Sequence, residues 1–499
     1  MDSIQNIQTT LGELSSTLDL TADCIAIVLA AGHGKRIKSE TSKMLHEIWG
    51  TPTVVRVANA AQNGLQTQNQ IIVVGIKATE VARSSGKKPN RQFVFQAEQN
   101  GTGHAVKVAL DALANADYGG DIFIFPGDMG LLTSETVHEF KSQYKSTPCD
   151  MMILTGVFEG DAEDNYYGRV LRVPEVDSQG GTSGADRGKV IEIKEQKDIL
   201  ALDASRPYQV DFGGRTYSFS REELIEMREF NTGVYAFRAD KLQQQINALS
   251  TDNVQGELYL TDLIRIFNQA GLTVQASAAE DNRTVLGFNV KSVLKEMESY
   301  ARERVYERLK DIISIADGND FFIADDVVEQ IIALDGNHGS LDIYIGKGAS
   351  IGKNVRLEKK VRIGNRASLC GPVFLAEGVA IQDNVRIAAA QNQQLKIGKN
   401  TKICQGNTIT GMVEIGAGCL LEPGVAVVGT DTSPANIGNN VVIKGSSHIL
   451  GSTIEDDILI EHSVLEGKYI KRIELPDGTV QAVRYVKPAP EGLDTITDI

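Results

Sequence analysis

The sequence predicts an α/β protein built in two different ways along its length. Between residues 25 and 157, apolar strand-like runs alternate with helical stretches, a pattern typical of a mostly parallel sheet covered by helices on both faces. From residue 341 on, an aliphatic side chain recurs every six positions. No helix has that period, and it indicates a parallel solenoid of short strands.

The first residues predict an amphipathic leader helix within 1–21. Its apolar side chains recur at helical spacing, at Ile4, Ile7, Leu11, Leu14 and Leu18. We expect this helix to pack on the domain that follows it, and a partner-binding helix is the alternative.

The first large domain is predicted to span 22–290. Strands are expected at 25–30, 71–76, 92–96, 121–126 and 151–157. Helices are expected near 52–62, 103–115 and 134–145. The Gly-, Ser- and Asp-rich stretch 175–189 reads as an exposed loop, after which strand and helix signals alternate again. Such sheets bind ligands beyond the carboxyl ends of their strands.

A linker of 291–340 is expected to join this domain to the solenoid, starting with a charged, Gly- and Pro-free helix over 291–313. The solenoid is predicted over 341–470. Two phase jumps of four residues each, within 388–396 and 428–436, predict loops that leave it. In the last segment, 471–499, two strands joined by Pro476-Asp477-Gly478 are expected to cap the solenoid, followed by a tail.

Composition excludes several classes of protein. The 499 residues carry a formal charge of −15, so a duplex-DNA binder is not expected, although a local pocket can still bind phosphates. The five cysteines form no CxxC pair, which argues against a disulfide scaffold or a zinc ribbon and favours the cytoplasm. No apolar run reaches the ~20 residues that span a bilayer, and we expect no membrane partner.

The candidate phosphate site follows the first strand, in the run from Leu29 to Arg36 (LAAGHGKR), with Lys43 a few residues on. Gly32 and Gly34 allow backbone N–H groups to approach a ligand, and Arg36 and Lys43 supply positive charge. The run matches neither the dinucleotide pattern nor a P-loop, and a plain tight turn is the alternative.

Two further strand ends carry candidate side chains. The stretch from Gln96 to Ala105 (QAEQNGTGHA) follows the third strand and suits hydrogen bonding to a base edge. Asp128 emerges at the end of the fourth strand, where a carboxylate can bind Mg²⁺ together with phosphate oxygens. A helix cap or a turn is the alternative for Asp128.

Further motifs follow in order along the chain, and together they carry a family resemblance. They are Tyr167-Gly168-Arg169, EQKD (195–198), NTG (231–233), QGELYLTD (255–262) and GFN (287–289). With these, the chain resembles the sugar-phosphate nucleotidyltransferases over about residues 22–290. It is most similar to the N-acetylglucosamine-1-phosphate uridylyltransferase half of the bacterial bifunctional enzymes that make UDP-N-acetylglucosamine. The resemblance implies a Rossmann-like nucleotidyltransferase domain followed by a left-handed parallel β-helix of hexapeptide repeats.

The resemblance also implies a role for each matching residue. The nucleotide would be lined by Leu29, Ala30, Gly32, Gln96, Gly101 and Thr102. Arg36 and Lys43 would hold the triphosphate as the catalytic cations, and Asp128 and Asn289 would bind Mg²⁺. Gly168, Glu195 and Asn231 would contact the amino sugar and its neighbours.

Each sugar-side residue has a structural alternative. Gly168 and Asn231 could serve turns, and Glu195 could form a surface salt bridge with Lys194 or Lys197. We expect His33 to be a tolerated loop residue and His104 to open a helix.

The implied reaction transfers the nucleotidyl group of UTP to N-acetylglucosamine-1-phosphate and releases pyrophosphate. The attacking phosphate oxygen is already anionic near neutral pH, so the reaction needs positioning and charge neutralisation rather than a general base. By analogy with other solenoids of this kind, a homo-oligomer is expected, with a trimer through the β-helix as one form.

The sequence departs from the family in ways that leave alternatives open. The bifunctional enzymes carry an acetyltransferase motif with a catalytic histidine, and that motif is not found here. The only histidines of the predicted solenoid are His448 and His462, near its end. Gly130 replaces a usual Pro, and the stretch between Glu195 and Asn231 carries an insertion. The sugar could therefore be glucose-1-phosphate or another hexose-1-phosphate. A non-catalytic regulatory subunit is a further alternative, against which the joint presence of the two cations and the Asp128–Asn289 pair argues.

Overall fold

The computed structural model describes residues 3–32, 34, 37–113 and 118–486. The chain divides into two compact units, Met1–Met297 and Glu298–Ile499. The division falls within helix α10 (Lys291–Leu309), which ends four residues before the expected limit. It ends there because Ser314 and Ile315 already pair with the solenoid.

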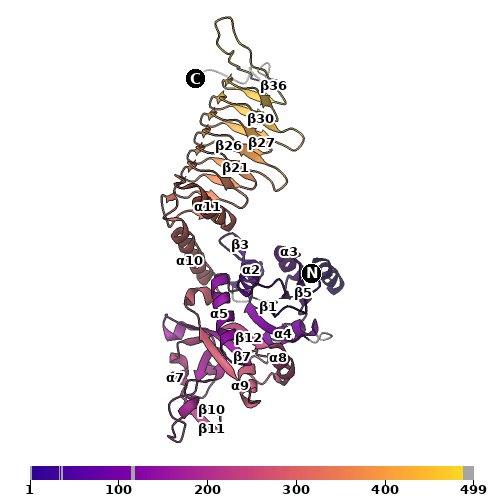
Figure 1. Cartoon of the computed structure of the whole chain (residues 1–499), viewed down its shortest axis with the longest axis vertical. Coiled ribbons are helices and arrows are strands. Elements are labelled where there is room, and N and C mark those ends of the chain that lie inside the picture. Colours follow the sequence, from indigo (N-terminus) through magenta and orange to yellow (C-terminus); the bar gives the residue numbers. More distant parts are fainter. Residues whose placement is uncertain (1–2, 33, 35–36, 114–117, 487–499) are drawn as a thin grey trace, which may run out of the picture. The chain divides into compact units, whose positions relative to one another are not determined.

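The sheet of the first unit is mixed and mostly parallel (Figure 1). Its strand order is β13-β7-β12-β6-β1-β4-β5. In chain order these strands are β1 (Cys24–Ala30), β4 (Gln70–Val74), β5 (Arg91–Phe95), β6 (Asp121–Pro126), β7 (Met151–Val157), β12 (Glu229–Arg238) and β13 (Val274–Ala278). The five predicted strands are confirmed to within two residues. β12 was not predicted, and it runs antiparallel to both of its neighbours, β6 and β7.

Helices cover both faces of the sheet because alternate residues of each strand point to opposite sides. In β1, Ala26 and Val28 belong to the core under α2 (Thr53–Leu65), α3 (Ala78–Ser85) and α5 (Ser134–Ser146). Ile25 and Ile27 belong to the other core, under α4 (Thr102–Asp111), α8 (Ala239–Gln245) and α9 (Asp262–Gln269). The predicted helices correspond to α2, α4 and α5, and α3 was missed.

The leader forms helix α1 (Ile4–Leu14), capped by the Ser3 side chain. It packs on α3 and on the edge strand β5. Beyond the helix, Ser16 donates its backbone N–H to Arg91 O at 2.7 Å, and Ser15 Oγ accepts from Phe93 N at 3.0 Å. The leader thus covers part of an edge that would otherwise present unpaired backbone groups.

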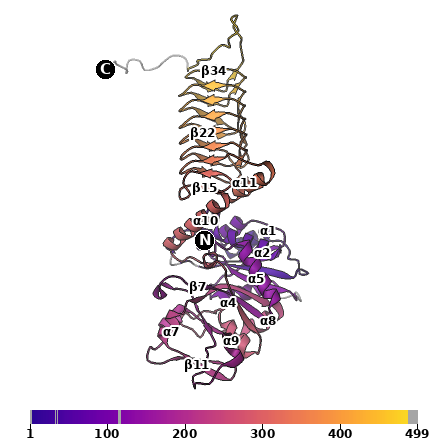
Figure 2. The ribbon, with the colours of Figure 1, turned by 60° about the vertical axis from the view of Figure 1, so that its left-hand side comes forward.

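The inserted stretch before Asn231 forms a β-hairpin, β10 (Tyr208–Phe212) with β11 (Arg215–Phe219). It has a small hydrophobic core of its own, shared with β8 (Arg169–Arg172), β9 (Val190–Lys194), α6 (Gln196–Leu200) and α7 (Arg221–Glu226). Figures 1 and 2 show this hairpin at one end of the first unit, far from α2.

The second unit is a parallel β-helix whose short strands stack in three sheets (Figure 2). The three sheets run from β14 (Ser314–Ile315) to β34 (Leu459–Ile460), from β15 (Phe322–Ile323) to β35 (Val464–Glu466) and from β18 (Arg356–Leu357) to β36 (Tyr469–Ile470). Ile345 pairs with Ile363, which pairs with Ile381, so the aliphatic of every sixth residue stacks inward on the next coil. The predicted hexapeptide solenoid is confirmed.

The solenoid begins earlier in the chain than its repeat pattern shows. β14 and β15 precede helix α11 (Asp325–His338) and already pair with β16 (Tyr344–Ile345) and β17 (Ser350–Ile351). At the other end, the expected strands on either side of Pro476-Asp477-Gly478 meet only in an isolated bridge, Glu474 with Val480. The tail beyond residue 486 lies outside the described residues.

Candidate functional site

The carboxyl ends of β1 and β6 lie side by side and bring two loops together. Leu29 pairs with Pro126, and Gly127 donates its N–H to Leu29 O at 2.9 Å. A Cβ on Gly127 would lie 3.0 Å from that same oxygen, which is tighter than an ordinary contact, so the close approach favours glycine. Leu29 and Ala30, at the end of β1, therefore border the loop that carries Asp128.

Lys43, Asp128 and Asn289 form one partly buried polar cluster at this edge. The Lys43 ammonium forms a short ion pair with Asp128 Oδ2 and donates a hydrogen bond to Asn289 Oδ1 at 2.8 Å. The side chains of Lys43 and Asp128 are only 10% and 17% exposed. The structure therefore brings together three of the four residues that the resemblance assigns to the triphosphate and to Mg²⁺.

The segment before α10 closes over this cluster. A Cβ on Gly287 would lie 3.4 Å from Asp128 Oδ2, in van der Waals contact with it, so Gly287 lies beside the carboxylate with no side chain between them. The following residue is Phe288, and the centroid of its ring lies 5.4 Å from the Lys43 ammonium. No role was predicted for either residue, although both lie in the GFN motif.

Gly34, which follows β1, lies against the same lysine. Gly34 has a positive φ of 58°, and a Cβ there would lie 2.7 Å from Lys43 Cβ. Among the residues that the structure describes, a Cβ on Gly32 would come within 4 Å of Met44 Cε alone, at 3.9 Å. Arg36, the second predicted cation, lies outside the described residues, as does His33.

The predicted base-binding residues lie beyond β5 and at the start of α4. Gln96 is 3% exposed, and its amide nitrogen donates to Gly101 O at 3.3 Å and contacts His104 Nδ1 at 3.1 Å. Gly101 has a φ of 100°, and a Cβ there would clash with Leu258 O at 2.5 Å. Thr102 Oγ1 accepts from Leu260 N at 3.1 Å. These residues therefore form one surface with the 258–260 segment, and His104 lies in the first turn of α4, as expected.

Gly168, Glu195 and Asn231 form a second cluster, at the ends of β8 and β9 and on β12. Asn231 donates its N–H to Gly168 O at 2.9 Å, and a Cβ on Gly168 would lie 3.1 Å from Glu195 Oε1. The Asn231 carboxamide oxygen accepts from Gly233 N and from the Tyr235 hydroxyl, both at 2.9 Å. Within the described part of the chain, that leaves the amide nitrogen of Asn231 as the group available to a ligand.

Glu195 lies in an acidic environment rather than in a surface salt bridge. Lys194 pairs with Glu192 at 3.8 Å, and Lys197 donates to Gln255. Burial, followed by the nearby charges of Asp198 and Asp262, raises the pKa of Glu195 to about 7.

Tyr167 connects the two clusters and was missed as a functional residue. Its hydroxyl donates to Gly287 O at 2.9 Å, and its ring stacks on Phe230 with centroids 4.4 Å apart. The sequence did carry one indication of a role for Tyr167, namely its place in the motif Tyr167-Gly168-Arg169.

Asp128 and Asn289 fit a magnesium ion that takes its other ligands from elsewhere. They offer one carboxylate and one amide oxygen, and no group of three or more Asp, Glu, His or Cys side chains able to hold a metal occurs among the described residues. Mg²⁺ keeps several waters and commonly combines one or two carboxylates with substrate phosphates. The donor set therefore suits a cation that arrives with a nucleotide.

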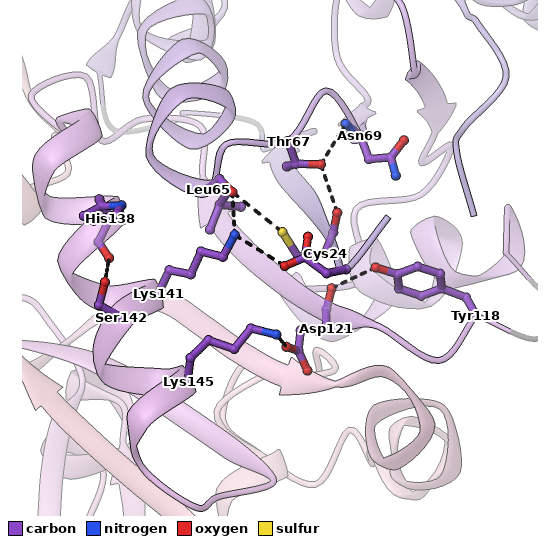
Figure 3. Close-up of polar contacts among 11 residues, drawn as sticks. Cys24, Leu65, Thr67, Asn69, Tyr118, Asp121, His138, Lys141, Ser142 and Lys145 are labelled. Carbon is purple, nitrogen blue, oxygen red and sulfur yellow. Dashed lines mark hydrogen bonds and ion pairs between the residues drawn. The ribbon is translucent and has the colours of Figure 1, made fainter. Parts of the chain in front are cut away.

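The opposite ends of β1 and β6 carry a polar network that includes none of the predicted site residues (Figure 3). Lys145 pairs with Asp121 at 2.6 Å, and Lys141 donates to Leu65 O at 2.6 Å. The Cys24 thiol lies nearby, and burial raises its pKa to about 11. These contacts tie α5 to β6 and to the end of α2, at the end of the sheet opposite the candidate site.

In the β-helix, both histidines lie on the outside. His448 is exposed on β32 (His448–Leu450), and the His462 ring contacts Gly445 O at 2.8 Å. No described helix of either unit is long and apolar enough to cross a membrane.

Comparison with known proteins adds independent findings. A family model, the MobA-like NTP transferase domain, matches residues 26–185. The chain is 30% identical over 473 residues to the bifunctional protein GlmU of Clostridium tetani, covering 87% of this chain and 94% of that protein. It is 29% identical over 496 residues to GlmU of Clostridium acetobutylicum, covering 94% and 97%. A solved structure of UDP-glucose pyrophosphorylase with UDP-glucose aligns with a TM-score of 0.38 and 13% identity, over 57% of this chain and all of that one.

Proposed function

This chain belongs to the family of the bifunctional GlmU proteins, and on that premise we propose that it transfers the uridylyl group of UTP to N-acetylglucosamine-1-phosphate, releasing pyrophosphate. The observation that carries the proposal is the cluster of Lys43, Asp128 and Asn289 at the carboxyl edge of the sheet. A buried cation and two oxygen ligands beside a glycine-containing loop are the groups that phosphate transfer requires.

The two clusters divide the substrate between them. Leu29, Ala30 and Gly32, with the surface of Gln96, Gly101 and Thr102, would hold the nucleotide. Gly168, Glu195 and Asn231 would hold the sugar, with the Asn231 amide nitrogen as a hydrogen-bond donor. The reacting phosphorus would then lie near Lys43, between the two clusters.

Lys43 supplies positive charge where phosphate charge develops. Its ammonium holds Asp128 and Asn289 in the free protein, and with a nucleotide bound we expect it to turn to the phosphate oxygens. Arg36, which follows Gly34 closely in the sequence, is proposed as the second cation.

Asp128 and Asn289 are the residues that would hold Mg²⁺, which when bound would neutralise phosphate charge and orient the triphosphate. The rest follows from this chain's own residues. An oxygen of the sugar-1-phosphate attacks the α-phosphorus of UTP, and pyrophosphate leaves in line. The nucleophile is already anionic, so the two clusters need only align it and exclude other geometries.

The groups proposed to carry this activity all lie in the first unit. The two histidines of the β-helix lie on its outside, and neither lies in a described cluster that would make it a catalytic base.

The test is pyrophosphate release by the purified chain with UTP and a panel of sugar-1-phosphates, in the presence of Mg²⁺. We expect the highest kcat/KM with N-acetylglucosamine-1-phosphate. A clear preference for glucose-1-phosphate would change the sugar, and no release with any member of the panel would refute the enzymatic proposal.

A further inference from the structure

Tyr167 is the one side chain described above that touches both halves of the candidate site. On one side its hydroxyl donates to Gly287 O at 2.9 Å. On the other its ring stacks on Phe230, which is fully buried and directly precedes Asn231. The next residue after Tyr167 is Gly168, whose carbonyl accepts from Asn231 N at 2.9 Å.

The sugar-side anchor of Tyr167 is rigid. Arg169 is 1% exposed, and its guanidinium donates to the carbonyl of Tyr167 and, at 2.9 Å, to that of Asn165. The Asn165 side chain in turn accepts from Tyr167 N at 3.1 Å. The backbone of Tyr167 is therefore fixed from both directions before its side chain reaches across.

The segment that Tyr167 reaches has little regular structure of its own. Residues 286–290 lie in neither a helix nor a strand. Yet this segment must hold Gly287 against the Asp128 carboxylate and Asn289 at 2.8 Å from the Lys43 ammonium. A hydrogen bond from a fixed tyrosine is a means of setting its position.

We propose that Tyr167 is a positioning residue, whose hydroxyl holds the Gly287–Asn289 segment against Asp128 and so sets the spacing between the cation-binding pair and the sugar-side cluster. The inference rests on the proposed function and deepens it. Burial, followed by the charge of Asp128, raises the pKa of Tyr167 to about 12, so its hydroxyl remains a donor at neutral pH.

The test compares Tyr167→Phe with the control Tyr166→Phe. The first variant keeps the ring that stacks on Phe230 and removes only the hydroxyl. The control removes the same group from a neighbour that is 61% exposed. Three quantities are measured: the affinity for Mn²⁺ alone by electron paramagnetic resonance, amide hydrogen exchange in the peptide that covers 286–290, and the steady-state kinetics of pyrophosphate release.

For Tyr167→Phe we expect about fivefold weaker Mn²⁺ binding, the size expected when one neutral hydrogen bond is lost. Exchange in the 286–290 peptide should be faster, and kcat should fall while the KM for UTP changes less than about twofold. The Tyr166→Phe control should match the wild type in all three.

Unchanged Mn²⁺ affinity and unchanged exchange in Tyr167→Phe would overturn the proposal. A lower Tm with unchanged Mn²⁺ affinity would overturn it as well, because the hydroxyl would then be merely structural. If the wild type releases no pyrophosphate but the Mn²⁺ and exchange differences are present, the positioning role stands and only the proposed function fails.

Discussion

Asp128 and Asn289 accept hydrogen bonds from the same ammonium group, that of Lys43, although one follows β6 and the other precedes α10. Two oxygens that share a cation in the free protein form a site for positive charge. The arrangement explains why three residues far apart in sequence are needed at one edge of the sheet.

Replacing Asp128 by Asn should abolish most of the turnover while the chain stays folded. The amide keeps the size of the side chain but removes the charge that would hold the divalent ion. We expect pyrophosphate release to fall at least ~100-fold. The matched control is Asp111→Asn, an exposed carboxylate at the end of α4, which should retain wild-type activity. Near-normal release by Asp128→Asn would contradict the role given to Asp128.

Replacing Lys43 by Met should increase the stabilisation of the free protein by Mg²⁺. The ammonium lies between Asp128 and Asn289, and without it a divalent ion can bind there with no competitor. Thermal unfolding followed by the fluorescence of Trp49, the single tryptophan, measures the effect in the first unit. We expect Mg²⁺ to raise the Tm of the variant by more than that of the wild type. Equal shifts in the two proteins would count against a shared cation site.

Glu195 should make the first unit less stable as the pH rises from about 4.5 to 7. Because its folded pKa is raised to about 7, the folded state binds more protons than the unfolded state in this window. Stability is therefore lost as the pH rises through it. Glu195→Gln should remove this loss. The free energy of unfolding of the variant, measured by urea unfolding followed by Trp49 fluorescence, should therefore rise relative to that of the wild type as the pH approaches 7. Parallel pH profiles would show that the shift is absent, and the exposed Glu226→Gln serves as control.

Asp121→Asn should weaken the first unit without affecting its chemistry. Asp121 lies at the end of β6 opposite the candidate site and accepts from Lys145 at 2.6 Å (Figure 3). It also accepts from the Tyr144 hydroxyl at 3.2 Å. Because Lys145 is 45% exposed, we expect a loss of only about 1 kcal/mol in the free energy of unfolding. The KM for UTP should be unchanged, and a large change in KM would mean that the two ends of the sheet are coupled.

Local patterns were sufficient for much of the fold. The apolar runs of β1, β4 and β6 are long and buried on both faces, and the sixfold repeat of the β-helix is strict, so both could be recognised from sequence. The direction of β12 could not, because an alternating apolar pattern does not tell which neighbours a strand pairs with. β14 and β15 are only two residues long and carry no repeat signal before α11.

The candidate site divides in the same way. That Lys43, Asp128 and Asn289 meet followed from strand ends and family motifs. The contact of Tyr167 with Gly287 did not, because it depends on how two loops far apart in the chain lie in space. The raised pKa of Glu195 likewise depends on carboxylates brought near it only by folding.

A crystal structure with UTP and Mn²⁺, in which anomalous scattering locates the metal, tests directly whether Asp128 and Asn289 form the metal site. We predict one Mn²⁺ bound to oxygens of Asp128, Asn289 and the nucleotide phosphates, with the Lys43 ammonium on the same phosphates. A metal peak bound elsewhere, with Asp128 and Asn289 still paired to Lys43, would contradict it.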